Sequence, residues 1–576
     1  MKSITIPALL IILFLLSPWQ AAGDHWPRPA GALLQHWFQP IAQEDAHRFF
    51  DPRSNPLAAL ARFYRCRGYR PSWIGEKGPL PQTKILLQAI RSAPDEGLPL
   101  INFSLDDAAL GLNRQVLFSD NRVSTYDHDL ARLDVALTAV MLKYAAHLSQ
   151  GFIRPEETSE GPPPHDVHAI RDIPGELAVA LNEDRLGSFI ESLVPRHQAY
   201  RDLKEILKRY RRIQAAGGWP QIGAGAALKP GATDARVAAL RRHLVITGDL
   251  PSDAMMDEDK FDPGLEAAVK RYQSRHGLTP DGTVGSRTLA SLNTPVEDRI
   301  IQLMLNMERW RWVPDDLGSR YIMVNIPGFE LQLVENEAVV LSMRAIVGRK
   351  SRPTPILTSQ MTYLELNPYW NIPQKIARKD ILPKIQNDPE YLARNGIRVF
   401  ESWQEDAAAL DPMGIDWSGV SEDYFPFRLR QQPAGGNALG RIKFMFPNSQ
   451  SVYIHDTPGK SLFVRPQRLF SSGCVRVEEP LVLAHYLLRD QHWSRRKLSH
   501  AVESGQNRAI VLQAPVPVHL AYFTAWTNTD GRIQFRDDVY GHDRRLLLDF
   551  LNAEASIYYC NAGGPATSHL KKNLKF

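Results

Sequence analysis

The spacing of apolar residues changes near residue 320, and this change limits the possible folds more than any other feature. Before it, apolar residues recur every three to four positions, as in DLARLDVALTAVMLKYAAHLSQG, which ends at Gly151. After it, RYIMVNIPGFELQLVENEAVVLSMRAIVG alternates apolar and polar residues in short runs, separated by PG and ENE turn signals. The alternation returns in RIKFMF, SVYIH and RAIVLQ. We therefore predict a multidomain α+β protein in which helical domains precede a β-rich domain.

The length of the chain indicates several folded domains. With 576 residues, 44% of them apolar, the chain can form three or four domains of about 100 to 200 residues each. The stretch AAGGWPQIGAGAALKPG is typical of a connection between domains. We predict a helical N-terminal domain, a domain of three short helices, a β-rich domain and a C-terminal segment, at residues 24–215, 226–293, 321–515 and 516–576.

The first 23 residues have the pattern of a secretory signal peptide. Lys2 precedes an apolar stretch from Ile4 to Leu16, and Ala21-Ala22-Gly23 resembles a small-residue cleavage site. The stretch is shorter than the roughly 20 residues of a transmembrane helix, and later apolar runs are interrupted by charged residues or proline. We predict cleavage of residues 1–23 and export as a soluble protein, with an uncleaved anchor as the alternative.

The small net charge and the few cysteines exclude some functional classes. A formal charge of +5 over this length argues against a dedicated nucleic-acid binder. Cys66, Cys474 and Cys560 are too few for a disulfide framework, and an odd count leaves at least one thiol free. Cys66 and Cys560 lie among aromatic residues and are expected to be small buried hydrophobes, although a bridge between them is also open.

His165 and His168 lie three residues apart in the loop GPPPHDVH, a spacing that a metal site can use. No cysteine or third histidine accompanies them. We therefore interpret this stretch as an ordinary polar loop.

The remaining cysteine lies in a small polar loop downstream of a histidine. His455 ends the predicted strand SVYIH, and the loop SSGC begins sixteen residues later. A cysteine attacks a carbonyl carbon as the thiolate, which requires a nearby base or positive charge. Neutral His455 can accept the thiol proton, or the pair can rest as thiolate and imidazolium. We expect Asp456 or its backbone carbonyl to orient the ring.

Residues beside Cys474 can contribute to such a site. Gly473 allows the backbone to approach a substrate closely, and the amides around Gly473 and Cys474 can bind a developing oxyanion. Arg476 faces the same side as Cys474 if the chain is extended there. Its guanidinium then adds positive charge near the sulfur and can bind a substrate carboxylate.

Two parts of the sequence resemble known families. The segment LEAAVKRYQSRHGLTPDGTVGSRTLASLN, within residues 226–293, resembles the three-helix peptidoglycan-binding module of cell-wall enzymes. The sequence HDTP, followed after twelve residues by SSGCVRV, resembles the signature of the YkuD-type L,D-transpeptidases. The common form has a histidine before Gly-Cys, whereas Ser472 stands here, as in the large periplasmic members of Gram-negative bacteria with a helical N-terminal domain.

This resemblance implies a YkuD-type catalytic domain with a helical capping insert at about residues 367–434. It implies that Cys474 is the nucleophile and His455 the proton donor and acceptor. Tyr453, Ser471 and Ser472 are implied active-site neighbours, and with Gly473, Asp456 and Arg476 they complete the predicted substrate-binding set. The aromatic residues Tyr369, Trp370 and Trp403 of the insert either line a substrate cleft or, as we favour for each, serve ordinary packing.

The implied activity is cell-wall biogenesis in the periplasm, through 3-3 crosslinks between donor and acceptor stem peptides of peptidoglycan. No metal or organic cofactor is implied, and other wall synthases are candidate partners. Hydrolysis by an L,D-carboxypeptidase and non-catalytic wall binding remain alternatives. A papain-like or sortase-like protease is disfavoured because neither CGSCW nor a TLxTC strand is present.

Overall fold

The computed structural model describes residues 28–44, 52, 55–75, 78–99, 125–153, 171–252, 259–388, 390–404 and 406–551. These residues form two compact units. One contains the chain up to residue 276, residues 280–315 and the residues from 524 onward, and the other contains residues 277–279 and 316–523. The predicted signal peptide, His165, His168 and Cys560 lie outside the described residues. Within the described ranges, no helix has the length and hydropathy to cross a bilayer.

The first unit begins with helices that share one core, as the helical spacing predicts. Gly151 ends the longest helix with φ of +91°, a conformation that favours glycine. The core contains aromatic residues such as Phe38, Phe63 and Trp73. The helices are α2 (Arg28–Glu44), α3 (Pro56–Cys66), α4 (Pro81–Ser92), α6 (Thr125–Gln150), α7 (Ile173–Asn182) and α8 (Leu186–Leu193), with the short strands β1 (Ile74–Gly75) and β2 (Gly78–Pro79). The next helix, α9 (Gln198–Ala215), lies outside this core and packs on α13 (Val296–Arg311).

The prediction that Cys66 is a small buried hydrophobe was wrong. Cys66 is the last residue of α3 and is exposed, with a free thiol. Phe63 and Tyr64 of the same helix face the core and are fully buried. The neighbouring aromatic residues therefore occupy the apolar side of the last turn, and Cys66 lies on the other side.

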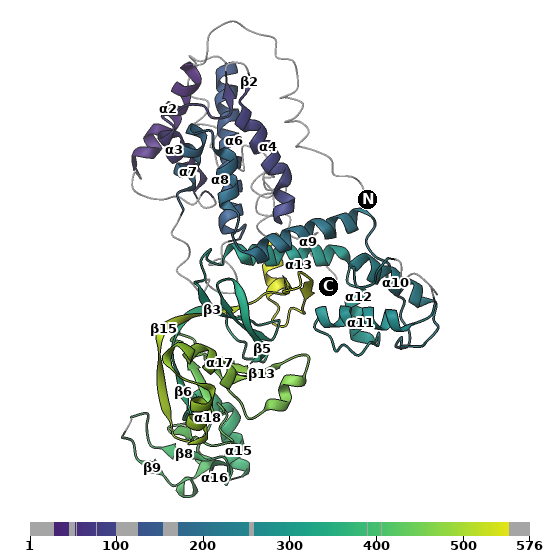
Figure 1. Ribbon diagram of the computed structural model, residues 1–576. Helices are drawn as coiled ribbons and strands as arrows, with labels where there is room; N and C mark the ends of the chain where they lie inside the picture. Colours follow the sequence, from purple (N-terminus) through teal and green to yellow (C-terminus); the bar gives the residue numbers. More distant parts are fainter. Residues whose placement is uncertain are drawn as a thin grey trace. The chain divides into compact units, whose positions relative to one another are not determined.

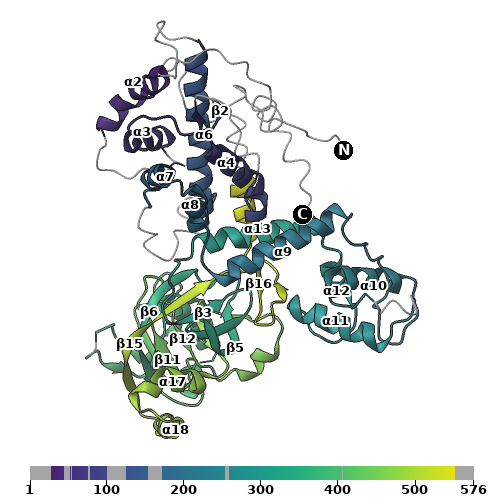
Figure 2. The same ribbon diagram turned by 45° about the horizontal axis from the view of Figure 1, so that its top comes forward.

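Three short helices follow as predicted, and they lie together in Figures 1 and 2. They are α10 (Arg236–Thr247), α11 (Pro263–Arg275) and α12 (Ser286–Leu292). Asp262 caps α11, because its carboxylate accepts from the Leu265 amide at 2.8 Å. Gly248 and Gly282 have positive φ angles, as expected of the predicted helix end and turn.

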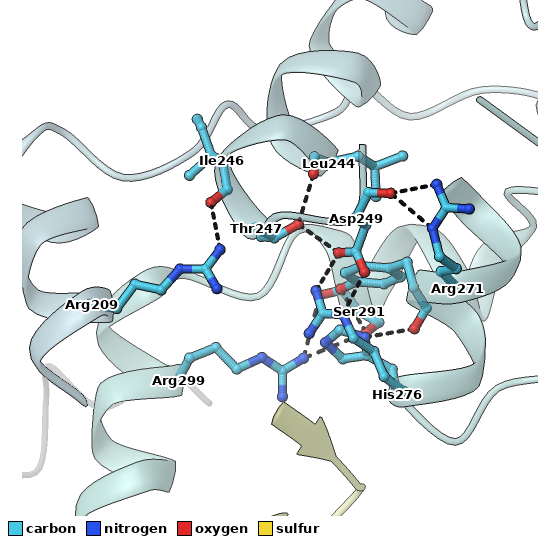
Figure 3. A network of polar contacts seen from close by, with 11 residues as sticks. Arg209, Leu244, Ile246, Thr247, Asp249, Arg271, His276, Ser291 and Arg299 are labelled. Atoms are coloured by element: carbon cyan, nitrogen blue, oxygen red, sulfur yellow. Dashed lines mark hydrogen bonds and ion pairs between the residues drawn. The ribbon is translucent and has the colours of Figure 1, made fainter. Parts of the chain in front are cut away.

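A buried polar network fixes this three-helix module (Figure 3). The Asp249 carboxylate accepts from Arg275 at 2.7 and 2.5 Å and from the Thr247 hydroxyl at 2.7 Å. The ring of His276 stacks on Tyr272 with centroids 3.8 Å apart. His276 also stacks, at 5.5 Å, on Phe535 in strand β17 (Ile533–Phe535), which pairs with β16 (Ala525–Thr527). Strand β17 therefore packs on the module.

The second unit is built on one sheet whose strands close into a ring. Their order is β5-β14-β12-β11-β6-β15-β3-β4, and β4 pairs again with β5. Alternate residues such as Ile322, Leu331 and Leu364 are fully buried, as the period-two pattern predicts. The strands are β3 (Arg320–Asn325), β4 (Glu330–Glu335), β5 (Ala338–Gly348), β6 (Leu357–Leu366), β11 (Ile442–Met445), β12 (Ile454–His455), β14 (Val475–Val477) and β15 (Arg508–Ala521), with β13 (Leu469–Ser471) added parallel to β5.

The predicted domain boundary at residue 515 falls inside β15. This strand pairs with β6 on both sides of a register shift between Val511 and Val516, and then continues parallel to β3 up to Ala521. Pro515 and Pro517 lack an amide hydrogen and are typical of bulges, and for this reason the sequence there reads as a strand end.

The insert between β6 and β11 is a small subdomain with its own core. Its buried residues include Ile372, Val399 and Leu429. Besides the predicted short helices it contains a four-stranded sheet of order β7-β10-β8-β9. Its elements are β7 (Trp370–Asn371), α14 (Gln374–Ile376), a π-helical turn (Ala377–Ile381), α15 (Leu382–Asn387), α16 (Tyr391–Arg394), β8 (Ile397–Phe400), β9 (Ala409–Leu410) and β10 (Arg428–Gln431).

Candidate active site

The loop that carries Cys474 crosses the end of strand β5. On one side β13 runs parallel to β5, with Ser471 opposite Gly348. On the other side β14 runs antiparallel to β5, with Arg476 opposite Ile346. Residues 472–474 must therefore span the width of one strand, which places Cys474 at an end of the sheet.

Two buried hydroxyl groups hold this loop. Thr354 donates from Oγ1 to the Gly473 carbonyl at 2.7 Å and accepts from the Gly348 amide at 2.8 Å. Ser471 donates from Oγ to the Cys474 carbonyl at 2.5 Å and accepts from the Gly473 amide at 3.1 Å. Gly473 has φ of +118°, which favours glycine. The Gly473 amide is therefore engaged with Ser471, and this geometry does not favour its predicted role in binding an oxyanion.

The structure places His455 and Cys474 on the same face of two neighbouring strands. Strands β12 and β14 are parallel, with Ile454 opposite Val475 and His455 opposite Arg476. Ile454 and Val475 are fully buried on one face. Because side chains alternate along a strand, His455, Cys474 and Arg476 project from the other face, together with Tyr453.

The backbone carbonyl of Asp456, and not its carboxylate, orients the His455 ring. Nδ1 of His455 lies 2.5 Å from that carbonyl oxygen, which assigns the proton to Nδ1 and leaves Nε2 as an acceptor. The Asp456 carboxylate accepts from the Arg441 amide and pairs with Lys460, each at 2.8 Å. These contacts do not favour the predicted substrate-binding role of Asp456.

The electrostatic environment of His455 and Cys474 favours the uncharged form of both side chains. Burial, followed by the positive charges of Arg476 and Lys443, lowers the pKa of His455 to about 3. Burial raises the pKa of the Cys474 thiol, although hydrogen bonds from Tyr453 and the same two cations oppose the rise. Of the two forms that the sequence left open, the site therefore rests as thiol and neutral imidazole.

Lys443 is a site residue that the sequence interpretation missed. One row of residues crosses four adjacent strands: Glu365, Lys443, His455 and Arg476 are successive cross-strand partners. The Lys443 ammonium lies 4.3 Å from the centroid of the Tyr453 ring. Lys443 sits on the polar side of the alternation in RIKFMF, but the sequence does not reveal which strands become neighbours.

Ser472 is exposed and accepts hydrogen bonds from two arginines that were also missed. Arg349 and Arg352 donate to its hydroxyl at 3.0 and 3.1 Å. Both arginines follow β5 directly and pair with Asp380 in the π-helical turn of the insert. The insert thus contacts residues beside Cys474.

The three aromatic residues of the insert have different surroundings. The Trp370 side chain hydrogen-bonds Tyr453, which in turn hydrogen-bonds Cys474. The Tyr369 ring lies 4.8 Å from the guanidinium of Arg430. Trp403 is 49% exposed, so the prediction of ordinary packing was wrong for this residue.

No group of three potential metal ligands occurs in the ranges that the structure describes.

Models of known families match three parts of the chain. A YkuD model described as "L,D-transpeptidase catalytic domain" matches residues 319–510, and a "Scaffold domain" matches residues 58–207. A "Putative peptidoglycan binding domain" matches residues 233–292. Residues 319–510 are therefore similar to the catalytic domain of YkuD-type L,D-transpeptidases, residues 58–207 to a scaffold domain and residues 233–292 to a peptidoglycan-binding domain.

Similar individual proteins include a curated relative and a solved structure. A "Putative L,D-transpeptidase" of Haemophilus influenzae is 37% identical over 260 residues, which cover 45% of this chain and 52% of the relative. The chain thus spans about half the length of that relative. The crystal structure of an L,D-transpeptidase from Xylanimonas cellulosilytica is 17% identical in sequence to this chain. The match covers 52% of this chain and 99% of the crystallised chain, with a TM-score of 0.16.

Proposed function

We propose that the protein forms 3-3 crosslinks between peptidoglycan stem peptides, through a thioester on Cys474. The observation that supports this proposal is the placement of His455 and Cys474 on one face of neighbouring parallel strands, with Nδ1 of the His455 ring bonded to the Asp456 carbonyl. The peptidoglycan-binding domain supports the same substrate.

In the first step, His455 accepts the thiol proton and the Cys474 sulfur attacks the carbonyl carbon of the third stem residue, diaminopimelate. The positive charges of Arg476 and Lys443 favour the sulfur anion as it forms. The bond from that carbonyl carbon to nitrogen then breaks, and His455 returns the proton to the leaving amine of D-alanine. The product is a thioester between Cys474 and the shortened stem.

In the second step, the side-chain amine of diaminopimelate in a neighbouring stem attacks the thioester. His455 accepts a proton from this amine, and Cys474 leaves as a thiol after protonation. Water in place of the amine would give an L,D-carboxypeptidase. The reaction takes place in the periplasm, to which the predicted signal peptide directs the protein.

Incubation of the purified protein with a disaccharide tetrapeptide tests this function. We expect a crosslinked dimer and free D-alanine by liquid chromatography and mass spectrometry. We expect Cys474→Ala to abolish both products and His455→Ala to lower the rate by about 10² to 10⁴-fold, because general acid–base catalysis is lost. His500→Ala, an exposed histidine of α18 (Arg495–Glu503), is the control.

Two outcomes contradict the proposal. Tripeptide without any dimer indicates hydrolysis and an L,D-carboxypeptidase. Binding of peptidoglycan without release of D-alanine, unchanged by Cys474→Ala, indicates a non-catalytic wall-binding protein.

A further inference from the structure

We propose that Arg349 is a second carboxylate-binding arginine of the active site and that, with Arg476, it binds a carboxylate of the donor peptide. This inference rests on the proposed function, which supplies a peptide substrate with free carboxylates. It adds to that function the residues that select the donor.

The backbone brings Arg349 to the nucleophile loop. Arg349 is the first residue after β5, and its amide donates to the Ser471 carbonyl at 3.0 Å. Because residues 472–474 cross this same end of β5, Arg349 leaves the sheet directly beside them. On the opposite side of the loop, Arg476 projects from the same face as Cys474.

The side chain of Arg349 is held in place and remains accessible. Its Nη2 donates to Ser472 Oγ at 3.0 Å and lies 3.4 Å from the Asp380 carboxylate, and the side chain is 43% exposed. Its Nε is a buried atom without a hydrogen-bond partner among the described residues. Donor capacity is therefore left for a ligand.

Arg352 differs from Arg349, because its guanidinium is engaged with Asp380 of the insert. Both of its terminal nitrogens contact Asp380, in the bidentate arrangement that arginine forms with carboxylates, and its side chain is only 12% exposed. Arg352 therefore neutralises most of the negative charge of Asp380. Little of that charge is left to compensate the positive charge of Arg349.

The charges around the loop do not balance. Arg349, Arg352, Arg476 and Lys443 face two carboxylates. Asp380 is shared by Arg349 and Arg352, and Glu365 is the cross-strand neighbour of Lys443. Arg476 has no ion pair within the described part of the chain, and its Nε is buried without a hydrogen-bond partner there. Two positive charges beside Cys474 therefore lack counterions of their own, which suits an anionic group of the substrate.

A donor tetrapeptide offers three such groups: the terminal carboxylate of D-alanine, the side-chain carboxylate of diaminopimelate and the α-carboxylate of the γ-linked glutamate. The test compares the natural donor with three donors, each amidated at one of these carboxylates, using wild type, Arg349→Gln and Arg349→Lys. Release of D-alanine, or of D-alaninamide from the donor amidated at that residue, gives kcat and KM. Arg394→Gln is the matched control, because Arg394 is an exposed arginine of the insert that pairs with Asp388 and Glu390.

With the natural donor we expect Arg349→Gln to lower kcat/KM by roughly 10- to 100-fold, mainly through KM, because a charge-assisted hydrogen bond to the substrate is lost. Arg349→Lys should recover part of this loss. With one of the amidated donors, wild type and Arg349→Gln should become equal, and that donor identifies the carboxylate bound. Melting temperatures should match those of Arg394→Gln.

The inference is overturned if Arg349→Gln leaves kcat/KM unchanged, or if it lowers kcat/KM equally for all four donors. Failure of the proposed function gives a different result, because wild type then forms no crosslinked dimer from any donor, whatever the effect of Arg349→Gln on the release of the terminal residue.

Discussion

At the scale of single residues, the proposed chemistry depends on where one proton resides. Lys443 and Arg476 act on both members of the pair, since they favour the sulfur anion of Cys474 and disfavour the imidazolium of His455. Burial disfavours both charged forms. The resting site is therefore uncharged at the pair, and in the proposed reaction the thiolate forms only as His455 accepts the proton.

The pH dependence of alkylation tests this resting state. Because the pKa of Cys474 is raised, its thiolate fraction at pH 7 is smaller than that of an ordinary thiol, and alkylation by iodoacetamide should accelerate into the alkaline range. Tyr453→Phe removes a hydrogen bond that lowers this pKa, so alkylation at pH 8 should become slower. Peptide mapping by mass spectrometry gives the rate, with the exposed Cys66 as an internal reference. A rate that already levels off below pH 7 would contradict this account.

At the scale of elements, the active-site loop depends on Thr354 as much as on the strands that flank it. Its buried hydroxyl joins the end of β5 to the Gly473 carbonyl, 119 residues later in the sequence. This contact fixes the left-handed conformation at Gly473 and therefore the direction in which Cys474 points.

Replacement of Thr354 tests this support. We expect Thr354→Val to lower the free energy of unfolding by about 1 to 3 kcal/mol, because buried polar groups lose their partner. It should also lower kcat by loosening the loop, and Thr354→Ser, which keeps the hydroxyl, should restore most of both. Chemical denaturation and D-alanine release are the measurements. A Thr354→Val protein with unchanged kcat would argue against a positioning role.

The sequence predicts elements well where a local pattern determines them. The helix that ends at Gly151, the strand ending at His455 and the three helices of the small module follow from spacing and turn residues. The local pattern does not reveal which strands become neighbours. For this reason Lys443, which lies beside Tyr453, and Arg349, which lies beside Ser472, were not predicted as site residues. The sheet in the insert was missed because its strands are only two to four residues long.

At the scale of the whole molecule, buried histidines make the first unit sensitive to acid. Burial lowers the pKa of His243 to about 3 and that of His276 well below its usual value. Below about pH 6.5 the unfolded chain binds protons at these rings that the folded chain does not bind, so stability decreases as the pH falls.

We expect His243 alone to cost about 2 kcal/mol of unfolding free energy between pH 7 and pH 5. His243→Phe keeps an aromatic ring next to Trp219 and Tyr272 but cannot titrate, so the loss of stability over this pH range should shrink by that amount. Urea denaturation of the full chain at both pH values is the measurement, with His36→Gln, on the exposed side of α2, as control. An unchanged difference between the two pH values would show that His243 is not the source.

Closure of the catalytic sheet also limits how a peptide can be recruited. Each of the eight strands in the ring has a neighbour on both sides, so an extended peptide can be added only where a neighbouring strand is shorter, as along Leu357–Met361 of β6 on its β11 side. Of the strands that the structure describes in this sheet, β13 alone keeps one side without a neighbour, and it ends at Ser471. Next to Cys474, main-chain recruitment of a peptide to this sheet is thereby limited to the three-residue border of β13.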